Sequence, residues 1–535
     1  MLHFIPAWYA NGTWCEQEQH WYSRRMHTEF DDTVKHIQLF HRNRIFPFQI
    51  LLLSYAPNFR HFLHRQGVFH APYWSCFDAI QEIQRKKQAL LSYHNLKWPE
   101  GTEFHYTLFV IVALVNGKKY AKIEFGEDGN LIEIDLYRDD QLIRKNIYDD
   151  RGFLSSTIVF KHGEAIYQDF LGETGSWRVR HHFSDGHVSV NPKFAHFRLE
   201  IGEQVKTVSF QQENYPSMEA LIDEVLCAYL KGTDSKDIFC AAVHPRHMAL
   251  VQKTFHQRNL VLSLFEERNA LRVDEQTRQA LCGARHLICD STEGMNLLKE
   301  SASGELPNCT VITPFDTRPD FGISQQMTMQ KILVPVDGLE ERGLYELVMT
   351  LGTFLHDHDD TEVHFFTRSA EYSWKETLMN KVELILKSVE LQSLEEREQK
   401  QRSHLIPRFF YQQCVDELSV SKCLREQRLI VDLRTRRDVY LRVIAISMGI
   451  PQILLHPSEF MVSGENGTLL SHVQELPGVM EHYLGELANW NHAMICAYEL
   501  GKKFDTAAQV EKWKGVINSF GQHSCVDAGE RGTSS

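Results

Sequence analysis

The sequence lacks the short motifs that identify several large enzyme classes. It has no GxSxG nucleophile elbow, no GxxxxGK[ST] phosphate loop, no HExxH zinc motif and no GxGxxG dinucleotide motif. These absences do not exclude an enzyme, but they remove the direct arguments for a hydrolase, an ATPase, a metalloprotease or a dehydrogenase. We expect neither a metal nor another cofactor.

Long apolar runs are also absent. The longest, Ile45–Tyr55 and Thr107–Val115, are well short of the ~20 residues that span a bilayer. Met1–Tyr9 is apolar but has none of the basic residues that open a signal peptide. The 11 cysteines are scattered without a CxxC pair, which is typical of reduced thiols. We therefore expect a cytoplasmic protein.

Basic charge is in deficit. The chain has 57 Lys and Arg against 70 Asp and Glu, a net charge of −13. This balance argues against nucleic-acid binding and leaves at most peripheral membrane contact. The hydrophobic share of 43% and charged share of 24% are those of a globular protein. At about 150 residues per domain, 535 residues predict three or four domains.

Evenly spaced turn signals predict an antiparallel β-sheet domain over residues 105–216. Glycines mark the turns at Gly117, Gly129, Gly152, Gly163, Gly175 and Gly186, and Asp139-Asp140 supplies a turn within the longest gap. A spacing of 8–12 residues is typical of consecutive hairpins. The strands between the turns alternate polar and apolar residues, so one face of the sheet should be wet.

Strands alternate with helices on both sides of this segment, which predicts parallel sheets. Before it we expect strands at Leu2–Ile5 and Phe48–Tyr55 and helices at Asp31–Phe40 and Asp78–Ser92. After it we expect a helix at Ser217–Leu230, strands at Ile238–Val243, Ala284–Cys289 and Thr310–Thr313, and a linker at Pro314–Ile323.

A second α/β unit follows the linker. Its expected strands are Lys331–Val336, Glu362–Thr367, Arg428–Leu433 and Gln452–Leu455, with helices at Glu340–His356, Trp374–Gln401 and Asp438–Met448. The predicted division is a first lobe in two parts, 1–104 and 217–327, the inserted sheet 105–216, a second lobe 328–477, C-terminal helices 478–520 and a disordered tail 521–535. Ligands of parallel sheets lie beyond the carboxyl ends of the strands, so the cleft between the lobes is the expected site.

Three stretches resemble the two-Rossmann glycosyltransferase-B family. They are Ala284–Ser291, Val311–Asp316, and Ala445–Ile453 followed by Glu465–Leu470. The resemblance implies an α/β fold of two Rossmann-like lobes with an inserted antiparallel β-sheet domain. The order and spacing of the three stretches match those of the family.

The functional residues of that family are missing from the matching positions. Two glutamates flank the donor site in its retaining members, and here those positions are Arg436 and Ile444. Isoleucine has no group that accepts a hydrogen bond from a ribose hydroxyl. Asp337 or Gly338 stands where an arginine clamps the donor phosphates. The resemblance therefore implies a glycosyltransferase scaffold without donor-site carboxylates, and we expect no enzyme activity.

A more specific resemblance covers nearly the whole chain. The opening Phe4–Tyr9, with Trp14, Trp21 and Phe30–Thr33, is similar to the first accessory Sec system proteins of Gram-positive bacteria. That family implies a cytoplasmic subunit that works with the second and third accessory Sec proteins, the accessory Sec ATPase and a serine-rich-repeat adhesin carrying N-acetylglucosamine-type glycan. The implied role is export of that adhesin.

Aromatic and basic residues at predicted strand ends are the candidate glycan or cleft-binding residues. Trp8 and Tyr9 end the first strand, where they would stack on sugar rings or pack against a neighbouring lobe. His244 and Arg246, in a His-Pro-Arg-His run, follow another strand and would serve as a metal or acid–base site or as a polar strand end. His356–Asp360 would bind a metal or form a solvated loop.

The run Arg434–Arg437 opens a predicted helix. Arg434 and Arg436 would bind phosphate at the helix N-terminus, pair with an acidic partner, or stay exposed. The leading hypothesis is a non-catalytic component that binds the glycosylated adhesin and its partner subunits. The alternatives are an active glycosyltransferase that modifies the adhesin and an assembly scaffold without glycan affinity.

Overall fold

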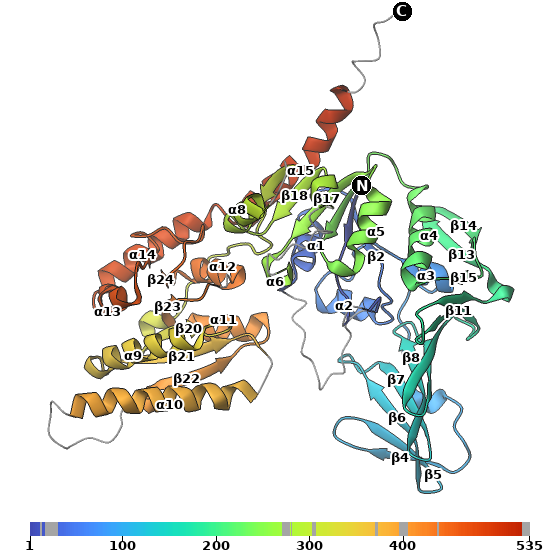
Figure 1. Cartoon of the computed structure of the whole chain (residues 1–535), viewed down its shortest axis with the longest axis horizontal. Coiled ribbons are helices and arrows are strands. Elements are labelled where there is room, and N and C mark those ends of the chain that lie inside the picture. The colour runs from blue at the N-terminus through green and yellow to red at the C-terminus, as the bar shows by residue number, and fades with distance from the viewer. Residues whose placement is uncertain are drawn as a thin grey trace, which may run out of the picture.

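The computed structural model describes residues 1–10, 13–15, 30–269, 279, 281–301, 306–369, 373–394, 405–435 and 438–526. Within them the chain forms two lobes, each built on a parallel sheet, and a long antiparallel sheet that extends from the first lobe (Figure 1). The predicted fold class, two Rossmann-like lobes with an inserted antiparallel sheet, is confirmed.

Lobe 1 is built on seven parallel strands in the order β19-β18-β17-β16-β1-β2-β3. The strands are β1 (Leu2–Ile5), β2 (Phe48–Leu52), β3 (Tyr73–Ser75), β16 (Ile238–Ala242), β17 (Asn259–Leu264), β18 (His286–Cys289) and β19 (Asn308–Val311). The sequence analysis did not identify β3 or β17. The apolar strands β1 and β16 are buried along their whole length, as the centre of a helix-covered parallel sheet requires.

The helices of lobe 1 form two core clusters with this sheet. They are α1 (Asp32–Asn43), α2 (Phe59–Arg65), α3 (Cys76–Gln81), α4 (Met218–Leu230), α5 (Pro245–Phe255), α6 (Glu266–Asn269) and α8 (Thr292–Ser301). Asp31 caps α1, because its carboxylate accepts the backbone N–H groups of Thr33 and Val34.

The expected helix Asp78–Ser92 is wrong beyond Gln81. Glu82 ends α3 in the left-handed region, with φ 55°. The backbone N–H groups of Gln84 and Arg85 then donate to the carboxylate of Glu173 in the inserted sheet, at 2.6 and 2.7 Å. A tertiary contact takes the donors that a longer helix would have used internally.

The inserted sheet has ten strands in the order β15-β12-β11-β10-β9-β8-β7-β6-β5-β4, all antiparallel. They are β4 (Thr102–Tyr106), β5 (Ile111–Val115), β6 (Lys118–Phe125), β7 (Leu131–Arg138), β8 (Gln141–Asp149), β9 (Phe153–Lys161), β10 (Glu164–Leu171), β11 (Trp177–His182), β12 (Val188–Val190) and β15 (Asn214–Tyr215). A separate hairpin pairs β13 (His196–Ile201) with β14 (Gln204–Ser209). The six predicted turn glycines have φ between 73° and 85°, and Asp139 and Asp140 also adopt positive φ. The predicted turns are therefore confirmed.

Lobe 2 is built on six parallel strands in the order β22-β21-β20-β23-β24-β25. They are β20 (Gln330–Pro335), β21 (Thr361–Thr367), β22 (Phe409–Gln413), β23 (Gln427–Asp432), β24 (Gln452–Leu454) and β25 (Gly467–Leu469). Strands β22 and β25 were not predicted from the sequence. Helices α9 (Glu341–Asp357), α10 (Ser373–Leu394) and α13 (Leu476–Leu484) form one core cluster with the sheet. Helices α11 (Glu417–Arg425) and α12 (Val439–Met448) form another, and α14 (Leu487–Gly501) packs on α12.

The chain crosses between the lobes twice. The predicted linker Pro314–Ile323 runs from lobe 1 along α12, where the backbone N–H of Asp320 donates to the carbonyl of Ser447 at 2.9 Å. Helix α15 (Thr506–Val526) returns to lobe 1, and its Trp513 packs against Phe40 of α1 with ring centroids 5.0 Å apart (Figure 1). The two crossings join the lobes along one side of the molecule.

Helix α15 also corrects the prediction for the C-terminus. It continues to Val526, six residues into the tail expected to be disordered from residue 521. Each residue added to an existing helix gains a hydrogen bond at little cost, so the helix continues beyond Phe520. The remaining tail residues lie outside the described residues. No described helix is long and apolar enough to cross a membrane.

Candidate functional site between the lobes

The aromatic pair at the end of β1 is buried rather than presented to the cleft. Trp8 is 7% exposed, and its ring lies 4.6 Å from that of Phe62 between centroids. Its indole N–H donates to Asp31 at 3.1 Å. Tyr9 is 2% exposed and bonds through its hydroxyl to His247 Nδ1 at 2.8 Å. Neither alternative predicted for these rings, stacking on sugars or packing against a neighbouring lobe, describes them, because packing within lobe 1 covers both.

The His-Pro-Arg-His run forms the start of α5. His244 caps the helix by accepting the backbone N–H of Arg246 at 3.0 Å. Burial, with help from the charges of Arg268 and Arg246, lowers the pKa of His244 to about 4. His247 is fully buried between Tyr9 and the carbonyl of Ala242. The run is thus a polar strand end made of neutral imidazoles.

Arg246 lies against an aromatic face. Its guanidinium carbon is 4.9 Å from the ring centre of Trp14. Its Nε is buried and makes no hydrogen bond to any residue that the structure describes. This is a cation–π contact within lobe 1.

Arg434 forms an internal salt bridge. Its Nε and Nη2 donate to the two oxygens of Asp432 at 2.8 and 2.9 Å, and Arg442 donates to the same carboxylate at 2.8 Å. Burial opposes ionisation of Asp432, but the two arginines outweigh it and hold its pKa below the usual range. Of the three alternatives for Arg434, exposure is contradicted because the side chain is buried, and its bonds to Asp432 leave it unavailable for phosphate or an acidic partner. Arg436 lies outside the described residues.

The carboxyl ends of β20 and β23, where a donor would bind, are closed by the chain itself. Asp337 accepts hydrogen bonds from the Thr367 hydroxyl and the Arg368 backbone. Arg434 donates to the carbonyl of Asp337 at 3.3 Å. A small cavity beside Arg434, at the end of β23, has a volume of about 20 Å³. It admits a single water molecule and is far below the about 300 Å³ of a small ligand site.

Contacts between the lobes hold this edge shut. Arg368 of lobe 2 donates to Glu267 of lobe 1 at 2.8 Å and lies 3.3 Å from Asp438. Glu459 of lobe 2 accepts from the backbone and hydroxyl of Thr292 at the N-terminus of α8, at 2.8 and 2.6 Å. A helix N-terminus that faces the cleft and would favour an anionic ligand is therefore occupied by an internal carboxylate.

Buried acids gather at the strand ends of lobe 1. Arg268 donates to both oxygens of Asp32 and to the carbonyls of Val243 and Ser263. Burial raises the pKa of Asp290 to about 7. Burial and the neighbouring charge of Asp32 together raise the pKa of Asp31 to about 6. Arg268 thus forms ion pairs with both Asp31 and Asp32. The raised pKa values bring the protonation of Asp290 and Asp31 close to neutral pH.

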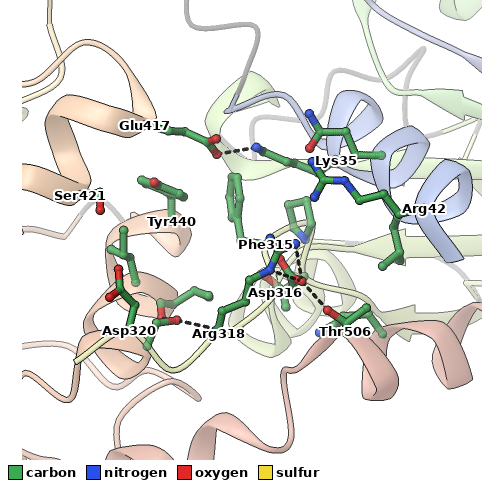
Figure 2. A pocket seen from close by; sticks show the side chains of 18 of the residues that line it. Lys35, Arg42, Phe315, Asp316, Arg318, Asp320, Glu417, Ser421, Tyr440 and Thr506 are labelled. Atoms are coloured by element: carbon green, nitrogen blue, oxygen red, sulfur yellow. Dashed lines mark hydrogen bonds and ion pairs between the residues drawn. The ribbon is translucent and has the colours of Figure 1, made fainter. Parts of the chain in front are cut away.

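A larger cavity lies beside this edge, between the helices of the two lobes. Its volume is about 770 Å³, within the range of small-molecule sites. Figure 2 shows Lys35 and Arg42 of α1 on one side, and Glu417 and Ser421 of α11 and Tyr440 of α12 on the other. Of the linker residues, Phe315, Asp316 and Arg318 lie between these walls, and Asp320 lies on the side of Ser421 and Tyr440. Thr506 of α15 lies below. Lys35 and Glu417 form an ion pair that joins the two lobes across the cavity.

The sequence analysis missed this cavity, with one exception. Ile444, noted there as the residue in a donor-glutamate position, lines it together with Val443 and Ser447. The linker Pro314–Ile323 was also identified, but as a connection only. The helix faces that form the walls carry no motif, so their meeting was not visible in the sequence.

The described residues contain one group of acids spaced for a metal ion, Glu124, Glu133 and Asp135 in the inserted sheet. Lys122 and Lys145 occupy its surroundings and form ion pairs with these acids. Two ammonium groups supply the positive charge that a metal would bring. In the other candidate, His356–Asp360, His358 Nε2 instead bonds to Glu481 at 2.7 Å, and the metal interpretation gains no support.

The architecture places the chain in the class of glycosyltransferase-B folds. It is similar to the crystal structure of the pneumococcal O-GlcNAc transferase GtfA in complex with UDP and GlcNAc, with a TM-score of 0.65 over 97% of this chain and 98% of that one, at 12% identity. At that identity the likeness concerns the fold alone. Unlike an open donor site, the strand-end edge here is filled.

The chain belongs to the family of the first accessory Sec system protein, accessory secretory protein 1, whose model matches residues 1–519. It is 33% identical to the member of this family from Streptococcus gordonii over 534 residues, 96% of this chain and 98% of that one. It also resembles a chain in the crystal structure of accessory secretory protein 1, 2 and 3 in Streptococcus pneumoniae. There the TM-score is 0.77 at 30% identity, over 98% of this chain and 100% of that one. The family expected from the sequence is confirmed.

Proposed function

We propose that the protein is a non-catalytic, cytoplasmic component of accessory Sec export that binds a glycosylated serine-rich-repeat adhesin together with its partner subunits. The observation that carries the non-catalytic part is the closed strand-end edge of lobe 2. Arg434 and Asp432 neutralise each other there, and the space left beside them is about 20 Å³.

The chemistry of donor activation supports the same conclusion. A retaining transferase stabilises positive charge that develops on the donor sugar, and preorganised carboxylates at the site supply much of that stabilisation. The positions of the two family glutamates hold Arg436 and Ile444 instead. A cationic side chain repels the developing positive charge, and an apolar side chain does not stabilise it. A binding protein has no such requirement.

The partners follow from the relatives. The pneumococcal structure contains accessory secretory proteins 1, 2 and 3. One chain of that structure resembles this chain over 98% of this chain and 100% of that one. We therefore propose that this chain assembles with the second and third accessory Sec proteins. We further propose that the complex presents glycosylated adhesin to the accessory Sec ATPase.

Turnover and binding are measured on the full-length chain with its co-expressed partner subunits. Labelled UDP-N-acetylglucosamine and a serine-rich peptide are the substrates, and the related O-GlcNAc transferase is the positive control. We expect no transfer, together with tighter binding of the N-acetylglucosamine-bearing peptide than of the bare peptide. Sustained transfer would overturn the non-catalytic proposal, and equal binding of the two peptides would favour an assembly scaffold without glycan affinity.

A further inference from the structure

The charges that line the interlobe cavity cancel. Three cations, Lys35, Arg42 and Arg318, face three acids, Asp316, Asp320 and Glu417. Lys35 pairs with Glu417, and Arg318 donates to Asp316 at 2.9 and 3.0 Å. A nucleotide or another polyanion needs an excess of cations, which this lining does not have. The cavity suits a ligand without net charge.

The lining is nevertheless rich in hydrogen-bonding groups. Ser421 and Ser447 add hydroxyls to the carboxylates and guanidinium groups. Planar carboxylate and guanidinium groups each make two hydrogen bonds to adjacent polar atoms, as neighbouring hydroxyls of a sugar ring offer them. A purely apolar ligand would displace water from these groups without replacing its hydrogen bonds, which is unfavourable. The ligand is therefore polar and rich in hydroxyl groups.

Apolar side chains in the same lining complete the match. Leu418 is 64% exposed, and Leu39 and Ile444 are half-buried. A sugar ring carries a C–H face, and an N-acetyl group carries a methyl, both of which gain from contact with apolar surface. Hydroxyl-binding groups beside a small apolar patch thus fit an N-acetylhexosamine better than a charged sugar.

Arg42 is the cation of this lining that is available to donate hydrogen bonds to a ligand. It is exposed, and it forms no ion pair with any described residue, whereas Lys35 and Arg318 are held by acids. In Figure 2 its side chain extends from α1 over the cavity. It can donate to a ring hydroxyl or an acetyl carbonyl without breaking an existing contact.

We propose that this cavity, rather than the strand ends, is the place where a sugar residue of the glycosylated ligand binds. This inference rests on the proposed function, because it locates the glycan binding proposed there. Arg42 donates to the sugar, the acids of the linker accept from its hydroxyls, and the apolar patch covers its C–H face. The Lys35–Glu417 ion pair keeps the two walls at a fixed separation.

The test uses the full-length chain with its partner subunits and a serine-rich peptide in N-acetylglucosamine-bearing and bare forms. Arg42→Ala removes the free donor, and Ser421→Trp fills the cavity from α11. The matched controls are Arg285→Ala, an exposed arginine away from the cavity, and Lys422→Trp, the next residue of α11, which is exposed and does not line it. Thermal unfolding of each variant checks that it is folded.

We expect both cavity variants to weaken binding of the glycosylated peptide by about tenfold, the usual scale for losing a hydrogen bond to a charged group, while the bare peptide and both controls keep wild-type affinity. If wild type prefers the glycosylated peptide and Arg42→Ala and Ser421→Trp retain that preference, the inference fails and the proposed function stands. If wild type shows no preference, the glycan part of the proposed function fails. Equal loss of both peptides would make the cavity a peptide site and would overturn the inference. Should Ser421→Trp not fold, Arg42→Ala decides alone.

Discussion

Glu459 of lobe 2 caps the helix that begins at Thr292 in lobe 1. Its two carboxylate oxygens accept the backbone N–H and the hydroxyl of Thr292 at 2.8 and 2.6 Å, and its own N–H donates to Glu293 at 2.6 Å. The contact joins residues 167 positions apart in the sequence. One side chain thus satisfies a helix terminus and links the two lobes.

The first prediction concerns this cap. Glu459→Ala removes the acceptor of the α8 N-terminus, which typically costs about 1 kcal/mol, and also removes the link between the lobes. We expect a lower midpoint of thermal unfolding and faster amide hydrogen exchange at the first turn of α8. Glu465→Ala, at an exposed position of the same lobe, is the control and should match wild type. Unchanged exchange at α8 in Glu459→Ala would contradict the prediction.

The second prediction concerns Asp432, which is 1% exposed and holds both Arg434 and Arg442. Asp432→Ala leaves two buried guanidinium groups without their acid. Removing one member of a buried ion pair typically costs about 3–5 kcal/mol. We expect a large fall in the denaturant midpoint of lobe 2 or loss of the folded protein.

An exposed ion pair supplies the comparison for Asp432. Glu511 pairs with Lys514 on the surface of α15, with both side chains at least half exposed. Glu511→Ala should change the unfolding midpoint very little, because exposed pairs contribute only about 0–1 kcal/mol. Similar losses in Asp432→Ala and Glu511→Ala would show that the buried cluster is not a stabilising element.

The third prediction concerns the turn between β7 and β8. Asp139 and Asp140 both adopt positive φ, of 47° and 60°. A two-residue hairpin turn with positive φ at both positions favours Asn-Gly or Asp-Gly. Asp140→Gly should raise stability by about 0.5–1 kcal/mol, since glycine adopts this conformation without strain. Chemical denaturation followed by the fluorescence of a probe in the inserted sheet measures it, and a decrease would contradict it.

Gly152 provides the opposite case in the same sheet. It has φ of 80°, and an added Cβ would lie 2.7 Å from the carbonyl oxygen of Ala89. Gly152→Ala should therefore destabilise the inserted sheet by more than Asp140→Gly stabilises it. Positive φ is common to both positions, so the excess of the loss at Gly152 over the gain at Asp140 reports the backbone crowding.

Features set by neighbouring residues could be predicted from the sequence, and features set by residues far apart in the chain could not. The turns of the inserted sheet were predictable, because a positive φ at Gly117 or Asp139 is a local property of one or two residues. The helix predicted from Asp78 was too long. Backbone N–H groups that would have continued it donate instead to Glu173, about 90 positions away. Local chemistry is readable in the sequence, and distant competitors for the same groups are not.

The candidate site shows the same limit more strongly. Trp8 lies just beyond the end of β1, and Phe59 and Phe62 cover it from α2, a helix that was not predicted from the sequence. The cavity depends on helix faces brought together by the lobes, and its Lys35–Glu417 pair spans 382 positions. The rule that ligands lie at strand ends pointed to the edge that the chain closes itself.

The last prediction is a pH dependence carried by Asp290. This residue is 3% exposed and accepts the backbone N–H of Glu266 at 2.9 Å. Burial raises its pKa from the ordinary 3.8 to about 7. Between these values the folded protein keeps the proton and the unfolded chain releases it. Stability therefore falls as the pH rises from about 4 to 7, since the unfolded state binds fewer protons.

Asp290→Asn isolates this effect, because asparagine keeps a carbonyl acceptor for the Glu266 N–H and does not ionise. The difference in unfolding midpoint between Asp290→Asn and wild type should grow in favour of the variant from pH 4 to 7 and level off above pH 7. Other titrating groups, such as Asp31, whose pKa is also raised, are present in both proteins and largely cancel in the difference. A difference that stays constant across this range would mean that Asp290 titrates as in the unfolded chain, and that Arg268 and the surrounding hydrogen bonds hold its charge.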